Sequence, residues 1–314
     1  MESNDQGTTQ GTGGIAARLQ EDTSIANRAM KFRLSRGGTA KRVRDKDAEA
    51  LVKSTMGDEG QIVSRETFTD KGNLVYQYQA VGNEMYCYHV KSTLPFGDNG
   101  DRLLPNSAYF DYTTEMQNFI SKTDHLKAQI LAQWPVLVQT DMNVRNARLT
   151  AQGKPPTAKV EDYPTLQQME SRLYVNWYPE PVMTSGDFRF ALPPDMLAKV
   201  DEQICALVAD AGRELYVRML KPVSAFIGKL NSFTGDKGQR WHDSFIDNLN
   251  GLSKELPKLN VNDDPVVTSL LQQIDAIVKP YAFQPDALKE DEFARSQVKA
   301  KLEALEAQLK GYAF

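Results

Sequence analysis

Cysteine and histidine are scarce in this 314-residue sequence. Its two cysteines, Cys87 and Cys205, lie far apart and in no C-x-x-C spacing, so neither a disulfide framework nor a zinc site is expected. Such cysteine usage is typical of a reducing compartment. Only three histidines occur. We therefore expect no metal and no other cofactor.

Long apolar runs are also missing. Apolar runs such as residues 136–138 and 270–271 fall far short of the roughly 18 residues that a membrane span needs. Residues 1–23 are polar and rich in Gly and Thr, without the basic and apolar regions of a secretory signal. A share of 41% hydrophobic and 9% aromatic residues is nevertheless enough to fill a core. We expect a cytoplasmic protein without a membrane partner.

Motifs of catalysis are absent as well. The sequence has no G-x-x-x-x-G-K-[ST], G-x-G-x-x-G, H-E-x-x-H or G-x-S-x-G, so four common kinds of catalytic machinery lack their local signature. His242 precedes Asp243 and Ser244, but neighbouring residues on a helix point in different directions and do not build a triad. A carboxylate pair from distant segments would leave no motif. We expect a binding protein and not an enzyme.

Positive charge is concentrated in one strip, residues 28–46. The strip has a net charge of +7, which leaves −11 on the rest of a chain whose total is −4. A basic strip on an acidic body is typical of a protein that meets a polyanion at one place. The alternative is a solvated charge run beside a flexible tail. Gly37-Gly38 interrupts the strip, with a short strand expected over 31–35 and a helix over 41–53.

Three segments predict an N-terminal antiparallel β-meander. Residues 61–69, 74–81 and 85–93 are rich in β-branched and aromatic residues, and residues 70–73 and 82–84 between them resemble hairpin turns. Alternation would place four tyrosines on one face of adjacent strands. If this face is exposed, it offers a platform on which unpaired bases stack; if it is buried, the rings are core residues. The tyrosines are Tyr76, Tyr78, Tyr86 and Tyr88.

Helices are expected to dominate the rest of the chain, which makes the fold α+β with a predominantly helical C-terminal half. Residues 109–149 have helical spacing, with a break near Pro135. Asp264-Pro265 is a helix start, and a C-terminal helix from about residue 286 carries an apolar seam over 298–309. That seam fits either an intramolecular partner or self-association into a homo-oligomer.

The expected organisation has three parts. Residues 1–27 form a disordered tail, residues 28–150 hold the basic strip, the β-meander and the first long helices, and residues 151–314 form a mainly helical region. Residues 151–162, with Gly and Pro-Pro, are the best internal linker, which either separates two domains or crosses the surface of one. Three clear strands are too few for an OB-fold, and no RNP signature of an RRM is present.

Several motifs resemble those of a group of tailed-phage proteins, over residues 95 to 280. Within such phages the sequence is most similar to the Drc group, the single-stranded-DNA-binding RNA polymerase cofactors of N4-related phages. The resemblance implies an early phage protein that binds unpaired DNA in the cytoplasm of the infected bacterial host and helps the phage RNA polymerase engage opened promoters. It assigns no binding residue. The motifs are Arg102-Leu103-Leu104-Pro105, Asp162-Tyr163-Pro164, Pro181-Val182, Gly186-Asp187-Phe188-Arg189, the run Trp241 to Leu249, Leu256-Pro257-Lys258-Leu259-Asn260 and Asp263-Asp264-Pro265.

The working hypothesis joins the basic strip to the tyrosines. Basic side chains would contact phosphates and the strand tyrosines would stack on bases, with weak sequence preference because every base has a π-face. About five phosphate contacts would give a log–log salt slope near −3.5. The rival is a helical adaptor that docks on a phage polymerase or ATPase without binding nucleic acid itself. The basic candidates are Arg33, Arg36, Lys41, Arg42, Arg44 and Lys46.

Overall fold

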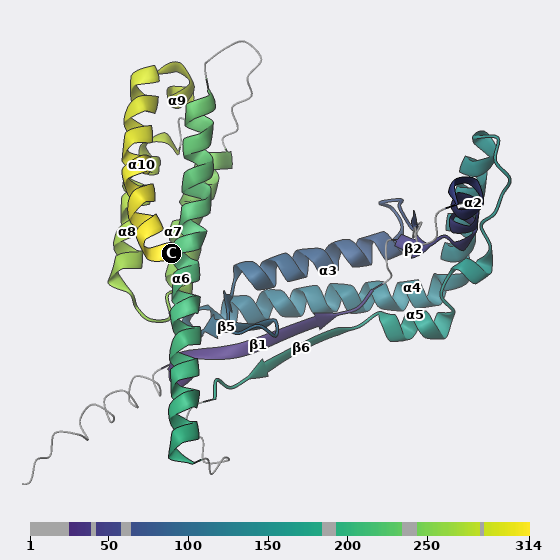
Figure 1. Ribbon diagram of the computed structural model, residues 1–314, viewed down its shortest axis with the longest axis horizontal. Coiled ribbons are helices and arrows are strands. Elements are labelled where there is room, and N and C mark those ends of the chain that lie inside the picture. The colour runs from purple at the N-terminus through teal and green to yellow at the C-terminus, as the bar shows by residue number, and fades with distance from the viewer. Residues whose placement is uncertain (1–24, 39–41, 58–63, 184–192, 234–243, 283–285) are drawn as a thin grey trace, which may run out of the picture. The chain divides into compact units, whose positions relative to one another are not determined.

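A computed structural model describes residues 25–38, 42–57, 64–183, 193–233, 244–282 and 286–314 (Figure 1). Helices make up most of these residues, and a small antiparallel sheet uses strands from the N-terminal part of the chain. The predicted α+β class is therefore confirmed. None of the described helices is long and apolar enough to cross a membrane.

The described chain forms two units, each assembled from separate segments. Unit 1 takes residues from 1–33, 90–110 and 178–314, and unit 2 takes residues 34–89 and 111–177. The expected linker at 151–162 lies inside unit 2, and the expected boundary near residue 150 does not separate the units.

The larger sheet has the strand order β4-β5-β1-β6. Strand β1 pairs with β5 in antiparallel fashion, from Ala29 opposite Pro105 to Arg33 opposite Asp101. The expected strand over 31–35 is confirmed. The bounds are β1 Ala29–Arg36, β4 Leu94–Pro95, β5 Asp101–Pro105 and β6 Val175–Glu180; a second sheet pairs β2 Arg42–Arg44 with β3 Ser64–Glu66.

The predicted β-meander is wrong, because most of its length is one helix, α3 Leu74–Lys91. Only β3 falls within the first expected strand, and the expected turn at 82–84 lies in the middle of α3. The buried positions of α3 advance by three or four residues, the helical period, and not by two. Burial against the core thus overrides the β-propensity of the tyrosines. These positions are Val75, Tyr78, Gly82, Met85 and His89.

The predicted break at Pro135 is also wrong. Helix α4 runs without interruption over Tyr109–Ala151, with Pro135 inside it. Proline removes one backbone hydrogen bond, but buried side chains on both sides of it belong to one core cluster of unit 2 and hold the helix in register. Trp134 is one of them, and its indole N–H donates to the carbonyl oxygen of Pro164 at 3.0 Å.

Helices α3 and α4 lie side by side in Figure 1 and share the core of unit 2. Phe68 closes that core, with its ring centroid 5.6 Å from those of both Trp134 and Tyr163. Asp141 of α4 joins the segments that carry Phe68 and Tyr163, because its oxygens accept from the Phe68 N–H and the Tyr163 hydroxyl, each at 2.9 Å. The further elements of unit 2 are α2 Lys46–Met56, η2 Val160–Asp162 and α5 Leu166–Arg172.

Unit 1 is mainly a helical bundle around α6 Pro194–Ser232, which stays continuous through Pro222. The apolar seam predicted over 298–309 is buried in this bundle against α6, so its partner is intramolecular. The helix start at Asp264-Pro265 is confirmed, since the Asp264 carboxylate accepts from the Val266 N–H at 2.8 Å. The remaining elements are η1 Asn106–Ala108, α7 Ser244–Glu255, η3 Leu256–Leu259, α8 Pro265–Val278, η4 Lys279–Tyr281, α9 Asp286–Glu290 and α10 Glu292–Ala313.

Candidate nucleic-acid interface

The first basic residues of the strip are held by carboxylates of unit 1. The Arg33 Nε donates to Asp101 Oδ1 at 2.6 Å, and Lys31 Nζ lies 3.1 Å from Asp101 and 2.7 Å from Glu180. The hydrogen bond from Arg33, against the opposing effect of burial and with help from Lys31, lowers the pKa of the Asp101 carboxyl. Arg28 pairs with Asp263 at 3.0 Å. Lys31 and Arg33 of β1 thus join their strand to β5 and β6, whereas Arg28 joins the segment before β1 to the segment before α8.

The later basic residues can be placed only by their backbone. Arg42 and Arg44 belong to strand β2, and Lys46 begins helix α2. Lys41 lies outside the described residues, as do the side chains of Arg42, Arg44 and Lys46. Their predicted role in phosphate binding stays a prediction.

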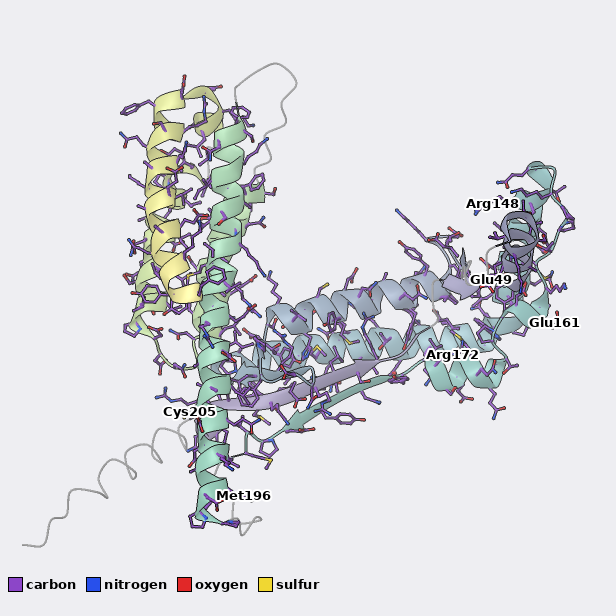
Figure 2. The ribbon with its side chains drawn as sticks, viewed as in Figure 1. Glu49, Arg148, Glu161, Arg172, Met196 and Cys205 are labelled. Atoms are coloured by element: carbon purple, nitrogen blue, oxygen red, sulfur yellow. The ribbon has the colours of Figure 1, made fainter. Side chains whose placement is uncertain are left out.

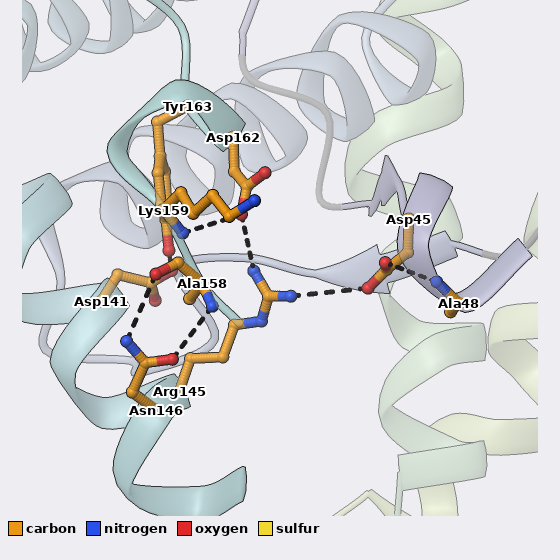
Figure 3. Close-up of polar contacts among 9 residues, drawn as sticks. All are labelled: Asp45, Ala48, Asp141, Arg145, Asn146, Ala158, Lys159, Asp162 and Tyr163. Carbon is orange, nitrogen blue, oxygen red and sulfur yellow. Dashed lines mark hydrogen bonds and ion pairs between the residues drawn. The ribbon is translucent and has the colours of Figure 1, made fainter. Parts of the chain in front are cut away.

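The position of α2 is anchored by a network around Arg145 of α4 (Figure 3). The guanidinium donates to Asp45 and to Asp162, both at 3.4 Å, and its side chain is only 17% exposed. Asp45 is the N-cap of α2, since its other oxygen accepts from the Ala48 N–H at 3.1 Å. One arginine thus joins three segments of unit 2 and sets the direction in which the chain leaves β2.

The four candidate tyrosines do not form one platform, because they lie on a helix. Each residue of a helix turns the side chain by about 100°, so a step of two residues turns it by about 200°. Tyr76 and Tyr78 therefore leave α3 on different sides, and so do Tyr86 and Tyr88. The expectation of a shared tyrosine face depended on strand alternation and is wrong.

Tyr88 is half-buried and packs against other aromatic rings of unit 2. Its ring stacks on Tyr112 with centroids 6.0 Å apart and an angle of 10° between the planes. Tyr112 in turn accepts from the Trp177 indole N–H at 3.0 Å and lies 2.6 Å from His89 Nδ1. Tyr76 is half-buried and lines a smaller cavity of about 150 Å³ beside Phe68.

Arg36 lies against α3 at Gly82, Asn83 and Tyr86. Its Nη2 donates to the Asn83 side-chain oxygen at 2.9 Å, and the centre of its guanidinium lies 5.5 Å from the centroid of the Tyr86 ring. Gly82 makes this approach possible, because a Cβ at that position would lie 2.9 Å from Arg36 Nη1. Tyr86 is 48% exposed, which leaves part of its ring open to a stacking partner. A cation and an exposed aromatic ring are thus held together.

A cavity of about 600 Å³ opens beside this pair, within unit 2. Its volume lies in the range of small-molecule sites, roughly 300–1,000 Å³. Four elements that are distant in the sequence build its wall. Residues of the wall that bear on binding are Arg36 and Gly38 at the end of β1, Tyr78 and Asn83 on α3, Thr123 on α4 and Val175 on β6.

The Gly37-Gly38 pair closes the cavity on the side of β1. Gly37 is packed tightly, since a Cβ would lie 2.1 Å from the carbonyl oxygen of Arg172, the last residue of α5 (Figure 2), and 2.4 Å from the Tyr174 ring. This packing leaves no room for a side chain at Gly37. Gly38 meets only the Tyr78 ring edge, at 4.0 Å, and stays accessible from the cavity.

Tyr78 is the most deeply buried of the candidate tyrosines, at 3% exposure. Burial, with a smaller contribution from Asp124 and against an opposing effect of Arg36, raises the pKa of its hydroxyl to about 12. At neutral pH the hydroxyl is therefore protonated and can donate a hydrogen bond.

Several wall residues have no counterpart in the sequence prediction. Gly82 and Met85 would have been found by reading 74–91 as a helix, since they follow Tyr78 at four and seven residues and return to its side. Gln79 and Asn83 follow Tyr78 at one and five residues and flank that side. Thr123 and Val175 come from other elements, and no spacing in one sequence connects them to α3. Among the described residues, no group of three or more His, Cys, Asp or Glu could hold a metal ion.

Comparisons with known proteins add no assignment. No protein-family model, no curated protein and no solved structure matches the chain.

Proposed function

We propose that the protein binds single-stranded DNA through the Arg36 site of unit 2. The observation that carries the proposal is the convergence of Arg36, the exposed ring of Tyr86 and a cavity of about 600 Å³ on one side of α3. Proteins that bind single strands combine positive charge that follows the backbone with aromatic rings on which bases stack. The sequence lacks common catalytic motifs, and we propose binding without catalysis.

The biological role that we propose is that of a transcription cofactor. The resemblance to single-stranded-DNA-binding cofactors of N4-related phages supports a protein that helps a phage RNA polymerase engage opened promoters in the cytoplasm of the infected host. Arg42 and Arg44, carried by β2, begin four residues after Gly38 and would extend the positive charge along a bound strand.

A direct test is fluorescence anisotropy of a labelled 30-nucleotide DNA, single-stranded and duplex, with the full chain. We expect the single strand to bind at least tenfold more tightly, and Arg36→Ala to weaken it by about tenfold through the loss of a charge-assisted contact. Arg213→Ala is the matched control, because Arg213 is 55% exposed on α6 in unit 1. Equal affinity of wild type and Arg36→Ala would contradict a site at Arg36.

The rival function, an adaptor for a polymerase or ATPase, is favoured by exposed aromatic side chains in unit 1. Phe110 is 79% exposed, Phe293 71% and Phe314 93%. Truncating residues 1–46 would not separate the two functions, because it removes β1, which lies between β5 and β6 in the sheet. Point substitutions separate the two functions. If the protein is an adaptor, the wild type should have no affinity for DNA, and Phe293→Ser should lose the capture of the polymerase.

A further inference from the structure

The hydroxyl of Tyr78 is a hydrogen-bond donor at the cavity. Tyr78 lies in the cavity wall at 3% exposure, and burial raises the pKa of its hydroxyl to about 12, so the group is protonated at neutral pH. A protonated hydroxyl in the wall of a cavity can donate to an acceptor atom of a bound molecule.

Arg36 and Asn83 add further donors to the wall, whose other polar side chains, Gln79 and Thr123, also carry acceptor oxygens. The Arg36 guanidinium has five N–H groups, and one of its two terminal nitrogens donates to the Asn83 oxygen. That bond leaves the amide nitrogen of Asn83 as a further donor. No acidic side chain lies in the described wall, and Asp124 acts on Tyr78 only electrostatically. A set of donors with one positive charge suits an anion with several acceptor oxygens.

The size of the cavity and its apolar wall indicate a ligand larger than an isolated oxyanion. Buried Met85, with no exposed surface, and the side chain of Val175 line the cavity together with the Tyr78 ring. At about 600 Å³ the cavity has room for a planar ring and a sugar besides a phosphate. An anionic end and an apolar, aromatic body are the chemistry of a nucleotide.

We infer that this cavity binds one nucleotide, whose phosphate oxygens accept hydrogen bonds from Arg36 and the Tyr78 hydroxyl while its base lies against Met85 and Val175. The inference deepens the proposed function and rests on it for the source of the nucleotide, which is then one unstacked residue of a bound strand. Tyr86, outside the cavity wall, is left to stack on a neighbouring base. A free nucleotide presents the same chemistry, and the test separates the two sources.

The test uses Tyr78→Phe, which removes the hydroxyl and keeps the ring in place. Tyr76→Phe is the matched control, because Tyr76 lies on the same helix and lines the smaller cavity. Two measurements are made on each full-length protein: anisotropy with a labelled dT30, and the thermal shift produced by millimolar thymidine 5′-monophosphate, with thymidine and inorganic phosphate at matched ionic strength. We expect Tyr78→Phe alone to weaken dT30 by about three- to tenfold and to lose the shift by thymidine 5′-monophosphate.

The outcomes separate the inference from the function on which it rests. Tight dT30 binding that Tyr78→Phe leaves unchanged, with no shift by thymidine 5′-monophosphate, overturns the nucleotide cavity and leaves single-strand binding intact. A Tyr78-dependent shift by thymidine 5′-monophosphate without dT30 binding supports the cavity and contradicts the strand as its source. A shift by inorganic phosphate equal to that by the nucleotide overturns the role of the apolar wall.

Discussion

The Arg36 guanidinium rests on Gly82, at a place in helix α3 where any side chain would collide with it. A Cβ on Gly82 would lie 2.9 Å from Arg36 Nη1, and no other atom outside α3 comes within the distance at which it would clash. Glycine in the interior of a helix destabilises it by roughly 0.5–1 kcal/mol relative to alanine. Glycine at position 82 therefore makes helix α3 less stable than alanine would, but it leaves room for the Arg36 guanidinium.

Gly82→Ala is predicted to weaken DNA binding without lowering the stability of the protein. The new methyl group displaces the guanidinium from Asn83 and Tyr86, so affinity for dT30 should fall by at least about threefold, or roughly 0.7 kcal/mol. The helix itself should become more stable, or at least no less stable, in urea unfolding. Gly228→Ala is the control, because Gly228 lies in α6 with open space around it. Unchanged affinity in Gly82→Ala would mean that the position of Arg36 is irrelevant to binding.

The lowered pKa of Asp101 makes the stability of the folded protein depend on pH. Its pKa in the folded protein lies below the ordinary value of 3.8, so the carboxylate stabilises the fold above that value and this contribution is lost as the pH falls through the folded pKa. Asp101→Asn should lose about 1 kcal/mol at pH 7, since Arg33 is partly exposed and screened. Urea unfolding of the wild type and of Asp101→Asn at pH 7 and pH 3 measures both the effect of the substitution and the stability lost on acidification. If the wild type and Asp101→Asn lose the same stability between these pH values, the ion pair does not carry the effect.

Arg145 is predicted to stabilise unit 2. Arg145→Lys keeps the charge but replaces two terminal nitrogens, one directed at Asp162 and the other at Asp45, with a single ammonium group, so the free energy of unfolding should fall by roughly 1 kcal/mol. Arg213→Ala, which breaks an exposed pair on α6, should change it by less than about 0.5 kcal/mol. Chemical unfolding compares them. A Lys variant as stable as the wild type would show that the network adds nothing.

Cys87 offers a footprint of the bound strand. It is exposed and follows Tyr86 directly on α3, whereas Cys205 is exposed on α6 in unit 1 (Figure 2). Saturating dT30 should slow maleimide labelling of Cys87, read by mass spectrometry in a Cys205→Ser background. Labelling of Cys205 in the Cys87→Ser protein should stay unchanged. Protection of Cys205 instead would move the interface to unit 1.

The elements that could be predicted from the sequence are those with local signals. Asp264 followed by Pro265 specifies a helix start, and the apolar steps of 298–309 specify a buried seam, because both depend only on neighbours in the chain. Helix α3 could not be recognised in this way. Its tyrosines favour strands, and Gly82 with Asn83 resembles a turn, whereas the side chain that explains Gly82 comes from Arg36.

The candidate site was predicted in part. The sequence indicated Arg36, Tyr78 and Tyr86, and the structure places Arg36 and Tyr78 in the wall of one cavity and the Tyr86 ring against the Arg36 guanidinium. Arg33, three residues before Arg36, is instead paired with Asp101, a partner that only the register of β1 and β5 reveals. Contacts between segments far apart in the chain decide which basic residues face a ligand, and one sequence does not contain them.

Strand binding at Arg36 is tested most directly by the salt dependence of dT30 binding, compared between the wild type and Arg36→Ala. Each phosphate contact on a single strand contributes about −0.7 to the log–log slope, so about five contacts predict a slope near −3.5 for the wild type. Removing Arg36 should reduce the slope to about −2.8, one contact fewer. A flat salt response in the wild type, or equal slopes for the two proteins, would contradict strand binding at Arg36.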